Sequence, residues 1–495
     1  MTRTQTLSAA LALGMFLAAA PAAEAQTAAP AQTPAPAAAG GDLDPRIQKL
    51  IASISEDRMK TLLTKLSSFT TRNTMSDPDL PNGLGAARQW ILDEMTKTSP
   101  KLQVSFDTHT IPASGRITRD VELLNIIAVL PGKSPRRIYV SGHYDSLNIP
   151  GQSGRAEGAT PPGPGAGRAN QGANTQAAAA NTQATGRGAG AGAAGQDAAA
   201  GRGRGQQPPP NYNVVAPGAN DDGSGTVLSM ELARVFAESG IEFEATLVFM
   251  TVAGEEQGLI GSTAHARRIK EQKVPVQALF NNDIVGNSTG GNGIVDGATV
   301  KVYSEGPEDS PSRSLANFAK RIAERYVPSH EIRLMARRDR FGRGGDHSGF
   351  NAEGFAAIGF RESKENYSKQ HNANDTIDGV AFPYLAQNAR ANAAGMAVLA
   401  LAPPPPEVRP NMLTRRPSGY DANLRWTASP NAVGYRIFWR KAWAPDWEHE
   451  LYVGNVTEFL MANQNIDDHV FGVAAVGPGG HESTISAYVM APRND

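Results

Sequence analysis

The sequence predicts an α/β fold with a mostly parallel central sheet and helices on both faces, followed by a small all-β sandwich. Between residues 44 and 402, short apolar runs alternate with amphipathic segments, which is typical of parallel strands joined by helical crossovers. After four consecutive prolines at 403–406, the apolar spacing changes to every second residue, as in antiparallel strands. A chain of 495 residues is also long enough for more than one domain.

Individual elements follow from the spacing of apolar residues. Helical spacing predicts helices over residues 47–54, 59–66, 86–95, 226–239, 315–326 and 384–402. Apolar runs predict buried strands at 125–130, at 138–140, within 245–256, within 276–283 and at 355–360. The first two runs are separated by a proline- and glycine-containing turn at 131–135, so we expect them to be neighbours in the sheet.

The last part of the chain predicts a separate small domain. Short alternating strands are expected at 424–426, 435–440, 451–453 and 471–476. This segment resembles a fibronectin type III module through Trp426, the strand that begins Gly434-Tyr435, and the turn at 473–480. The sequence does not indicate a partner for this module.

Composition predicts the domain boundaries. Residues 1–25 have a basic start, an apolar stretch and small residues before Gln26, as in a signal peptide, so we expect an exported, periplasmic or extracellular protein. Residues 26–43 are an alanine- and proline-rich leader that we expect to be disordered. The main domain is expected at 44–402, with a low-complexity insertion at about 151–212, a proline-rich linker at 403–410 and the sandwich at 411–495.

Charge and cysteine content narrow the classes of partner. With 47 basic and 48 acidic side chains the formal charge is −1, which argues against nucleic-acid binding. The apolar stretch within residues 1–25 could also be a membrane anchor, but it is shorter than the ~20 residues that a bilayer requires, and no other segment predicts a membrane span. The chain has no cysteine, so any metal must be bound through nitrogen and oxygen.

Acidic and imidazole side chains follow three of the predicted strands. His143, the pair Glu255-Glu256, and Asp283 each come directly after an apolar run. In an open α/β sheet, residues beyond the carboxyl ends of the strands can meet, and zinc accepts imidazole and carboxylate ligands. With Asp221 and His371, these residues predict a two-metal hydrolase site.

Six segments in order resemble the dinuclear zinc exopeptidase family that contains bacterial leucyl aminopeptidases and glutamate carboxypeptidase. The segments are Ser141-Gly-His143-Tyr-Asp145-Ser, Gly218-Ala-Asn-Asp221-Asp-Gly-Ser-Gly225, Gly254-Glu255-Glu256-Gln-Gly-Leu, Asn282-Asp283, Asp346-His347-Ser-Gly-Phe350 and His371-Asn-Ala-Asn-Asp375-Thr376. Each motif alone is weakly specific, whereas six in order over residues 44–402 are strongly specific. The resemblance implies a zinc exopeptidase-like fold and a peptide substrate.

The resemblance also implies a role for each metal-site residue. Asp221 would bridge two zinc ions, with Glu256 and His371 completing one ion. His143 and Asp283 would complete the other ion, although other divalent metals also accept nitrogen and oxygen ligands. Glu255 would act as the general base.

Surrounding positions carry further expectations. Asp145 is expected to accept the imidazole N–H of His143, and Asp375 either to do the same for His371 or to cap a turn. In the motif that begins at Asp346, His347 is expected to shape the pocket wall, with metal ligation as the less favoured alternative. Several relatives have an aromatic residue, commonly tyrosine, immediately before the last histidine. Here that position is Gln370, so the oxyanion donor could be this amide or Tyr367. The remaining histidines are expected to be structural: His109, His265, His330, His449, His469 and His481.

The function we expect is that of a secreted two-zinc aminopeptidase. A carboxypeptidase or small-amide hydrolase on the same site remains an alternative, because Arg338, Arg340 and Arg343 near the pocket motif could bind a terminal carboxylate. An inactive peptidase-like binding protein would be expected to lack a ligand or the base, and a single-metal site would favour glutaminyl cyclase-like chemistry.

Overall fold

The computed structural model describes residues 43–149, 211–415 and 419–489. Within these ranges the main domain contains one eight-stranded sheet, in the order β1-β2-β4-β3-β5-β8-β6-β7. The strands are β1 (Gln103–Ile111), β2 (Val121–Leu130), β3 (Ser134–His143), β4 (Ala245–Val252), β5 (Val276–Asn282), β6 (Thr299–Ser304), β7 (Glu331–Met335) and β8 (Ala357–Glu362). Strands β4, β3, β5 and β8 are consecutive neighbours and run parallel, whereas β1, β2 and β6 join the sheet through antiparallel pairs.

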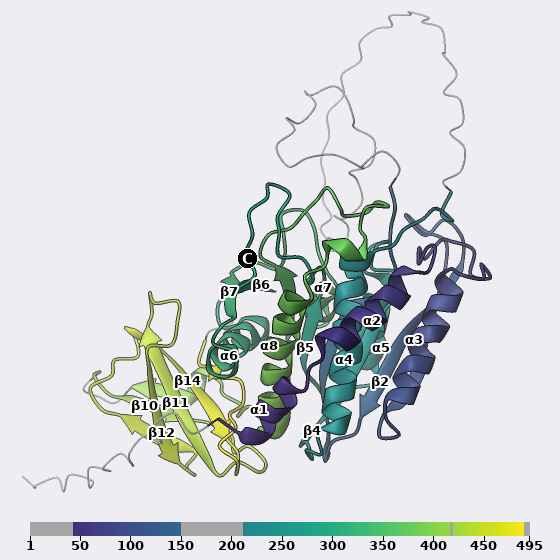
Figure 1. Cartoon of the computed structure of the whole chain (residues 1–495). Helices are drawn as coiled ribbons and strands as arrows, with labels where there is room; N and C mark the ends of the chain where they lie inside the picture. Colours follow the sequence, from purple (N-terminus) through teal and green to yellow (C-terminus); the bar gives the residue numbers. More distant parts are fainter. Residues whose placement is uncertain (1–42, 150–210, 416–418, 490–495) are drawn as a thin grey trace, which may run out of the picture.

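Helices cover both faces of this sheet, which confirms the predicted α/β class (Figure 1). One face carries α1 (Pro45–Ala52), α2 (Glu56–Ser67), α3 (Leu84–Thr98), α4 (Ser224–Glu238), α6 (Pro311–Tyr326) and α8 (Phe382–Leu401). The other face carries α5 (Ile260–Glu271) and α7 (His347–Ala352). Among the described residues, no helix combines the length and the apolar character needed to cross a bilayer.

Local sequence explains these elements. In β4, Leu247 and Phe249 pack with the larger helical layer, and Val248 and Met250 pack toward α5, as expected for side chains that alternate between the faces of a strand. At the start of α2 the hydroxyl of Ser55 accepts the N–H of Arg58, which satisfies a free backbone donor. The apolar runs at 245–256 and 276–283 therefore become central strands because both of their faces are buried.

Two features of the sheet differ from the sequence prediction. The runs at 125–130 and 138–140 form β2 and β3, but they are not neighbours, because β4 lies between them and pairs with both. The turn between them therefore connects strands across β4 and does not close a hairpin. In the described part of the main domain, three strands and two α-helices were not predicted: β1, β6, β7, α5 and α7.

The C-terminal part forms the predicted small sandwich. In the described residues, one sheet has the order β13-β10-β9 and the other the order β12-β11-β14-β15. The first consists of β9 (Leu413–Arg415), β10 (Ala422–Arg425) and β13 (Glu458–Met461), and the second of β11 (Gly434–Lys441), β12 (His449–Gly454), β14 (His469–Val476) and β15 (Ser486–Ala487). Buried residues of both sheets share one apolar core, in which the rings of Trp426 and Tyr435 are 5.4 Å apart. The closer resemblance to fibronectin type III stays a prediction.

The sandwich is attached to the main domain through buried charges and lies beside α6 in Figure 1. Arg440 pairs with Asp309 at 2.6 Å, and both side chains are buried. From α6, Arg321 pairs with Glu482 at 2.7 Å and lies over the ring of Phe438. These contacts hold the two domains in one arrangement.

The proline-rich segment between the domains is packed against the sandwich. Pro403 and Pro406 are buried, and the backbone oxygen of Pro404 accepts the hydroxyl of Ser429 at 2.5 Å. The segment expected to be a linker is therefore part of the interface. The predicted signal peptide, nearly all of the leader and nearly all of the insertion lie outside the described residues.

Candidate functional site

Three central strands end at one edge of the sheet and bring the predicted residues together. His143 is the last residue of β3, Asp283 directly follows β5, and Glu255 and Glu256 lie in the turn after β4. Because β3 pairs in parallel with both β4 and β5, these three ends are adjacent. The carboxyl edge of the sheet therefore carries the predicted donors.

Asp221 and His371 reach the same place from two loops. Asp221 lies in the turn at Ala219–Gly223, directly before α4. The carboxylate of Asp375 accepts the N–H of Asn220 at 3.0 Å and that of Asp221 at 2.8 Å, so it fixes this turn. Asp375 thus caps the turn that carries Asp221, the second of the two roles considered for it.

The donor atoms form two groups that share Asp221. One oxygen of Asp221 lies 3.4 Å from Nε2 of His143, which is also 3.7 Å from Oδ1 of Asp283. The other oxygen of Asp221 lies 3.1 Å from Nε2 of His371, which is 3.2 Å from Oε2 of Glu256. Each carboxylate oxygen of Asp221 therefore faces a different imidazole, as a bridging ligand requires.

These spacings fit metal coordination. Four ligands at about 2.0 to 2.2 Å in a tetrahedron lie about 3.3 to 3.6 Å apart, close to the observed separations. Nε2 of His143 and Oε1 of Glu256 are buried and have no hydrogen-bond partner among the described residues.

Both imidazoles lie among carboxylates. Burial opposes charge on His371, but Glu256 and Asp221 raise its pKa to about 9. The pocket therefore stabilises positive charge at these nitrogens.

Asp222 also lies beside His143 and Asp283, but its oxygens are occupied. One accepts the backbone N–H of His143 at 2.9 Å, and the other accepts the N–H of Gly225 at 2.8 Å and of Ile284 at 3.2 Å. Asp222 therefore joins the backbones of the site, and Asp221 has the oxygens that are free to bind ions.

Glu255 lies beside this group. Its Oε2 is 3.9 Å from Nε2 of His143, and its side chain is 12 % exposed. Burial raises the pKa of Glu255 well above its usual range, and the nearby carboxylates of Asp283 and Glu256 act in the same direction. A carboxylate with a raised pKa is suited to accept a proton near neutral pH.

Asp145 supports the site differently from the prediction. The Nδ1 atom of His143 lies 3.1 Å from the backbone oxygen of Asp145 and 3.5 Å from its carboxylate. The carboxylate itself accepts the N–H groups of Glu255 and Glu256, each at 3.2 Å. The backbone of Asp145 therefore orients the imidazole, and its side chain holds the turn after β4.

The remaining predicted residues lie around this centre. His347 is buried, and its Nε2 contacts the backbone oxygen of Arg338 at 2.8 Å, so the ring belongs to the wall. Asp346 is buried near the start of α5, and burial raises its pKa to about 7. Among the described residues, neither side chain belongs to a group of potential metal donors.

The two candidate oxyanion donors have other partners. The amide of Gln370 donates to Glu365 at 3.4 Å, and the hydroxyl of Tyr367 accepts from Arg343 at 2.6 Å.

Arg340 is enclosed by Asp339 and Glu365, whereas the side chain of Arg343 is 35 % exposed. Of these two arginines, Arg343 has more solvent-accessible surface for a ligand.

Two buried arginines were missed by the sequence analysis. Arg72 donates to the backbone oxygens of Tyr144 at 2.6 Å and Gly218 at 2.8 Å, and so ties the His143 strand end to the Asp221 turn. Arg361 pairs with Asp283 and lies 3.6 Å from Glu365. Arg361 gave the same signal as the predicted ligands, a charged residue after an apolar strand run, but Arg72 lies in a polar loop without such a signal.

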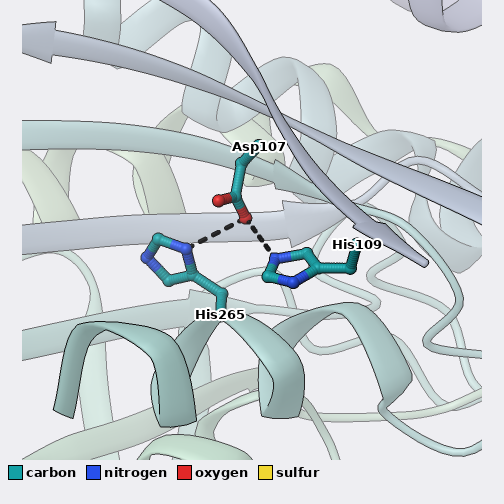
Figure 2. A group of neighbouring side chains, drawn as sticks. All are labelled: Asp107, His109 and His265. Atoms are coloured by element: carbon teal, nitrogen blue, oxygen red, sulfur yellow. Dashed lines mark hydrogen bonds and ion pairs between the residues drawn. The ribbon is translucent and has the colours of Figure 1, made fainter. Parts of the chain in front are cut away.

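A second cluster of potential donors lies between β1 and α5 (Figure 2). One oxygen of Asp107 contacts Nε2 of His109 at 2.8 Å and Nδ1 of His265 at 3.0 Å. These distances are those of hydrogen bonds, and Arg268 pairs with the same carboxylate. Hydrogen bonding and the charge of Arg268 account for this cluster, which fits the structural role expected for both histidines.

Comparison with known proteins identifies the family. The model of peptidase family M28 matches residues 204–396. A protein of Pyricularia oryzae named "Probable zinc metalloprotease" is 32 % identical over 482 residues, which cover 89 % of this chain and 84 % of the relative. The chain belongs to peptidase family M28. A protein of Leptosphaeria maculans with a similar name is 30 % identical and is covered over 96 % of its length.

Two solved structures are also similar to this M28 chain. Legionella pneumophila LapA matches with a TM-score of 0.49 and 18 % identity, over 72 % of this chain and 76 % of that protein. A glutaminyl cyclase of Fimbriiglobus ruber matches with a TM-score of 0.47 and 16 % identity, over 70 % of this chain and 95 % of that protein.

Proposed function

We propose that this M28 peptidase is an exported aminopeptidase that uses two zinc ions and Glu255 as general base. The observation that carries the proposal is the position of Asp221, whose two oxygens face His143 at 3.4 Å and His371 at 3.1 Å. His143, Asp221 and Asp283 would hold one ion, and Asp221, Glu256 and His371 the other. The zinc named in the relatives supports this choice of metal.

The residues of the chain divide the remaining work. When bound, zinc polarises a carbonyl oxygen and makes water more acidic. Glu255 is adjacent and not among the shared donors, so its carboxylate accepts the proton of the attacking water and returns it to the departing amine. Asp145 keeps Glu255 and Glu256 in place through their backbone N–H groups. Arg361 holds Asp283 in position.

Cleavage from the amino end is favoured by the charge around the site. Glu255, Glu256 and Asp283 lie within one buried group of carboxylates, which attracts the α-ammonium of a peptide. Arg343 favours the second candidate, a carboxypeptidase, because its guanidinium is partly exposed and could bind a terminal carboxylate. The two candidates differ in which end of the substrate must be charged.

Blocked substrates separate these candidates. Acetylation removes the α-ammonium and adds bulk, so we expect leucine amide to be cleaved and acetyl-leucine amide to be nearly inert. Loss of a buried charged partner costs about 2 to 5 kcal/mol, which is easily measured in kcat/KM. Rapid hydrolysis of acetylated dipeptide acids, lost on amidation or in Arg343→Ala, would instead establish the carboxypeptidase. Inactivity on both substrate types with metal bound would favour a binding protein.

Export rests on residues 1–25, which have the pattern of a signal peptide. We expect protein recovered from the periplasm or medium to begin near Gln26 when its amino terminus is sequenced. A chain that retains Met1 and stays with the cytoplasmic fraction would contradict export, without affecting the assignment of the metal site.

A further inference from the structure

The turn that carries Glu255 and Glu256 has a backbone that needs external support. It leaves β4 at Gly254, with φ of 72°, and reaches α5 through Leu259, with φ of 61°. The left-handed conformation is unfavourable for leucine and persists where surrounding contacts fix it. The carboxylate of Asp145 accepts the N–H groups of Glu255 and Glu256, but these two residues are in the middle of the turn. The ends of the turn are held by a different residue.

Asn125, a fully buried residue of β2, joins the two ends of this turn. Its Oδ1 accepts the N–H of Ala253, the residue before Gly254, at 2.9 Å. Its Nδ2 donates to the backbone oxygen of Gly261, in the first turn of α5, at 3.2 Å. The backbone closes the same junction, because Gly261 donates to the oxygen of Ala253 at 3.1 Å.

The cluster in Figure 2 fixes the orientation of this amide. Nδ2 of Asn125 also donates to Asp107 at 2.8 Å, and Asp107 is its direct cross-strand partner on β1. The same oxygen of Asp107 contacts His109 and His265, so the acceptor is held from three sides. The amide nitrogen must therefore point toward Asp107 and Gly261, which leaves its oxygen for Ala253.

The packing leaves little room at this junction. A Cβ atom built on Gly261 would lie 2.6 Å from Oδ1 of Asn125 and 2.1 Å from the oxygen of Ala253. Glycine at position 261 thus allows the start of α5 to approach the end of β4, and Asn125 fills the remaining space with paired polar atoms.

We propose that Asn125 is a positioning residue for catalysis, which sets the geometry of Glu255 by closing the base of the turn from β4 to α5. This inference rests on the proposed function, since it requires Glu255 to act as the base. Removing the amide would free the Ala253 N–H and the Gly261 end of the turn. Small errors in the placement of a catalytic group can cost about 100-fold in rate.

The test compares Asn125→Ala with the matched control Asn351→Ala. Asn351 also joins two backbone groups, the N–H and oxygen of Ala357, each at 3.1 Å, but at the beginning of β8, away from the carboxyl edge. At saturating zinc we expect Asn125→Ala to lower kcat by about 10- to 100-fold with KM within about threefold. Asn351→Ala should keep kcat within about twofold despite a lower Tm.

Hydrogen exchange supplies a readout that does not depend on turnover. The amides of residues 253–261 should exchange faster in Asn125→Ala than in the parent chain. In Asn351→Ala their exchange rates should be unchanged. If Asn125→Ala does not fold, Asn125→Ser takes its place: its hydroxyl can still accept from Ala253 but the amide donor to Gly261 is lost, so we expect a smaller fall in kcat and faster exchange mainly at the Gly261 end of the turn. Unchanged kcat, or an equal loss in the control, would overturn the inference. An inactive parent chain would instead refute the proposed function.

Discussion

Replacing Glu255 with glutamine should lower kcat by about 10²- to 10⁴-fold while two metal ions stay bound. Glutamine keeps the shape of the side chain but cannot accept a proton. The geometry separates the two neighbouring glutamates: Oε2 of Glu256 lies 3.2 Å from Nε2 of His371, within the donor group, whereas Glu255 approaches His143 only to 3.9 Å. Metal content and kcat measured on the same sample test this division.

The matched control for this prediction is Glu256→Gln. A neutral amide is a weaker ligand than a carboxylate, so this variant should bind less zinc and lose activity for that reason. If Glu255→Gln loses metal and Glu256→Gln retains it, the roles of the two residues are reversed. Thermal unfolding with and without added zinc distinguishes loss of a ligand from loss of the fold.

Several residues of the metal site could be predicted because they follow strands that are recognisable as apolar runs. Buried parallel strands are continuous apolar runs, and a charged residue at the end of such a run is easily recognised in the sequence. His143 and Asp283 are found in this way, and the structure places Nε2 of His143 3.4 Å from Asp221 and 3.7 Å from Asp283. Asp221 and His371 lie in loops, and only the order of the motifs indicated them.

The order of strands could not be obtained in the same way. Strands β2 and β3 are close in sequence, but β4, which is more than one hundred residues later, lies between them. Pairing depends on the complete sheet, whereas apolar spacing reports only on local structure. β1 was missed for a related reason: only Asp107 is buried in its pattern, so the strand has no apolar run.

Supporting polar residues are the least predictable from sequence. Asn125 is a single amide within the apolar strand β2, and Arg72 lies in a polar loop. Their roles depend on backbone atoms brought together by folding, such as Ala253 and Gly261 for Asn125. Their residue types do not identify these partners, so their functions can be proposed only from the structure.

Replacing Asp221 with alanine should reduce occupancy at both metal positions, whereas Asp283→Ala should affect mainly one. The reason is that the oxygens of Asp221 face His143 and His371 separately, whereas of these two imidazoles Asp283 lies beside that of His143. Each bound ion stabilises the fold by about 4 kcal/mol when free zinc is about 1,000 times Kd. Asp221→Ala should therefore lose most of the zinc-dependent rise in Tm, and Asp283→Ala about half.

Measurements on the metal-free proteins complete this prediction. Without cations, the buried carboxylates repel one another, and burial together with Asp221 and Asp145 raises the pKa of Glu256 to about 8. Asp221, in contrast, faces the imidazoles of His143 and His371, which despite burial hold its pKa well below its usual range, so metal-free Asp221→Ala should unfold at a somewhat lower temperature than the metal-free parent chain. Zinc titration followed by Tm and by metal analysis tests both expectations. If Asp221→Ala retains one tightly bound ion, Asp221 does not bridge, and Asp222 becomes the candidate ligand beside His143 and Asp283.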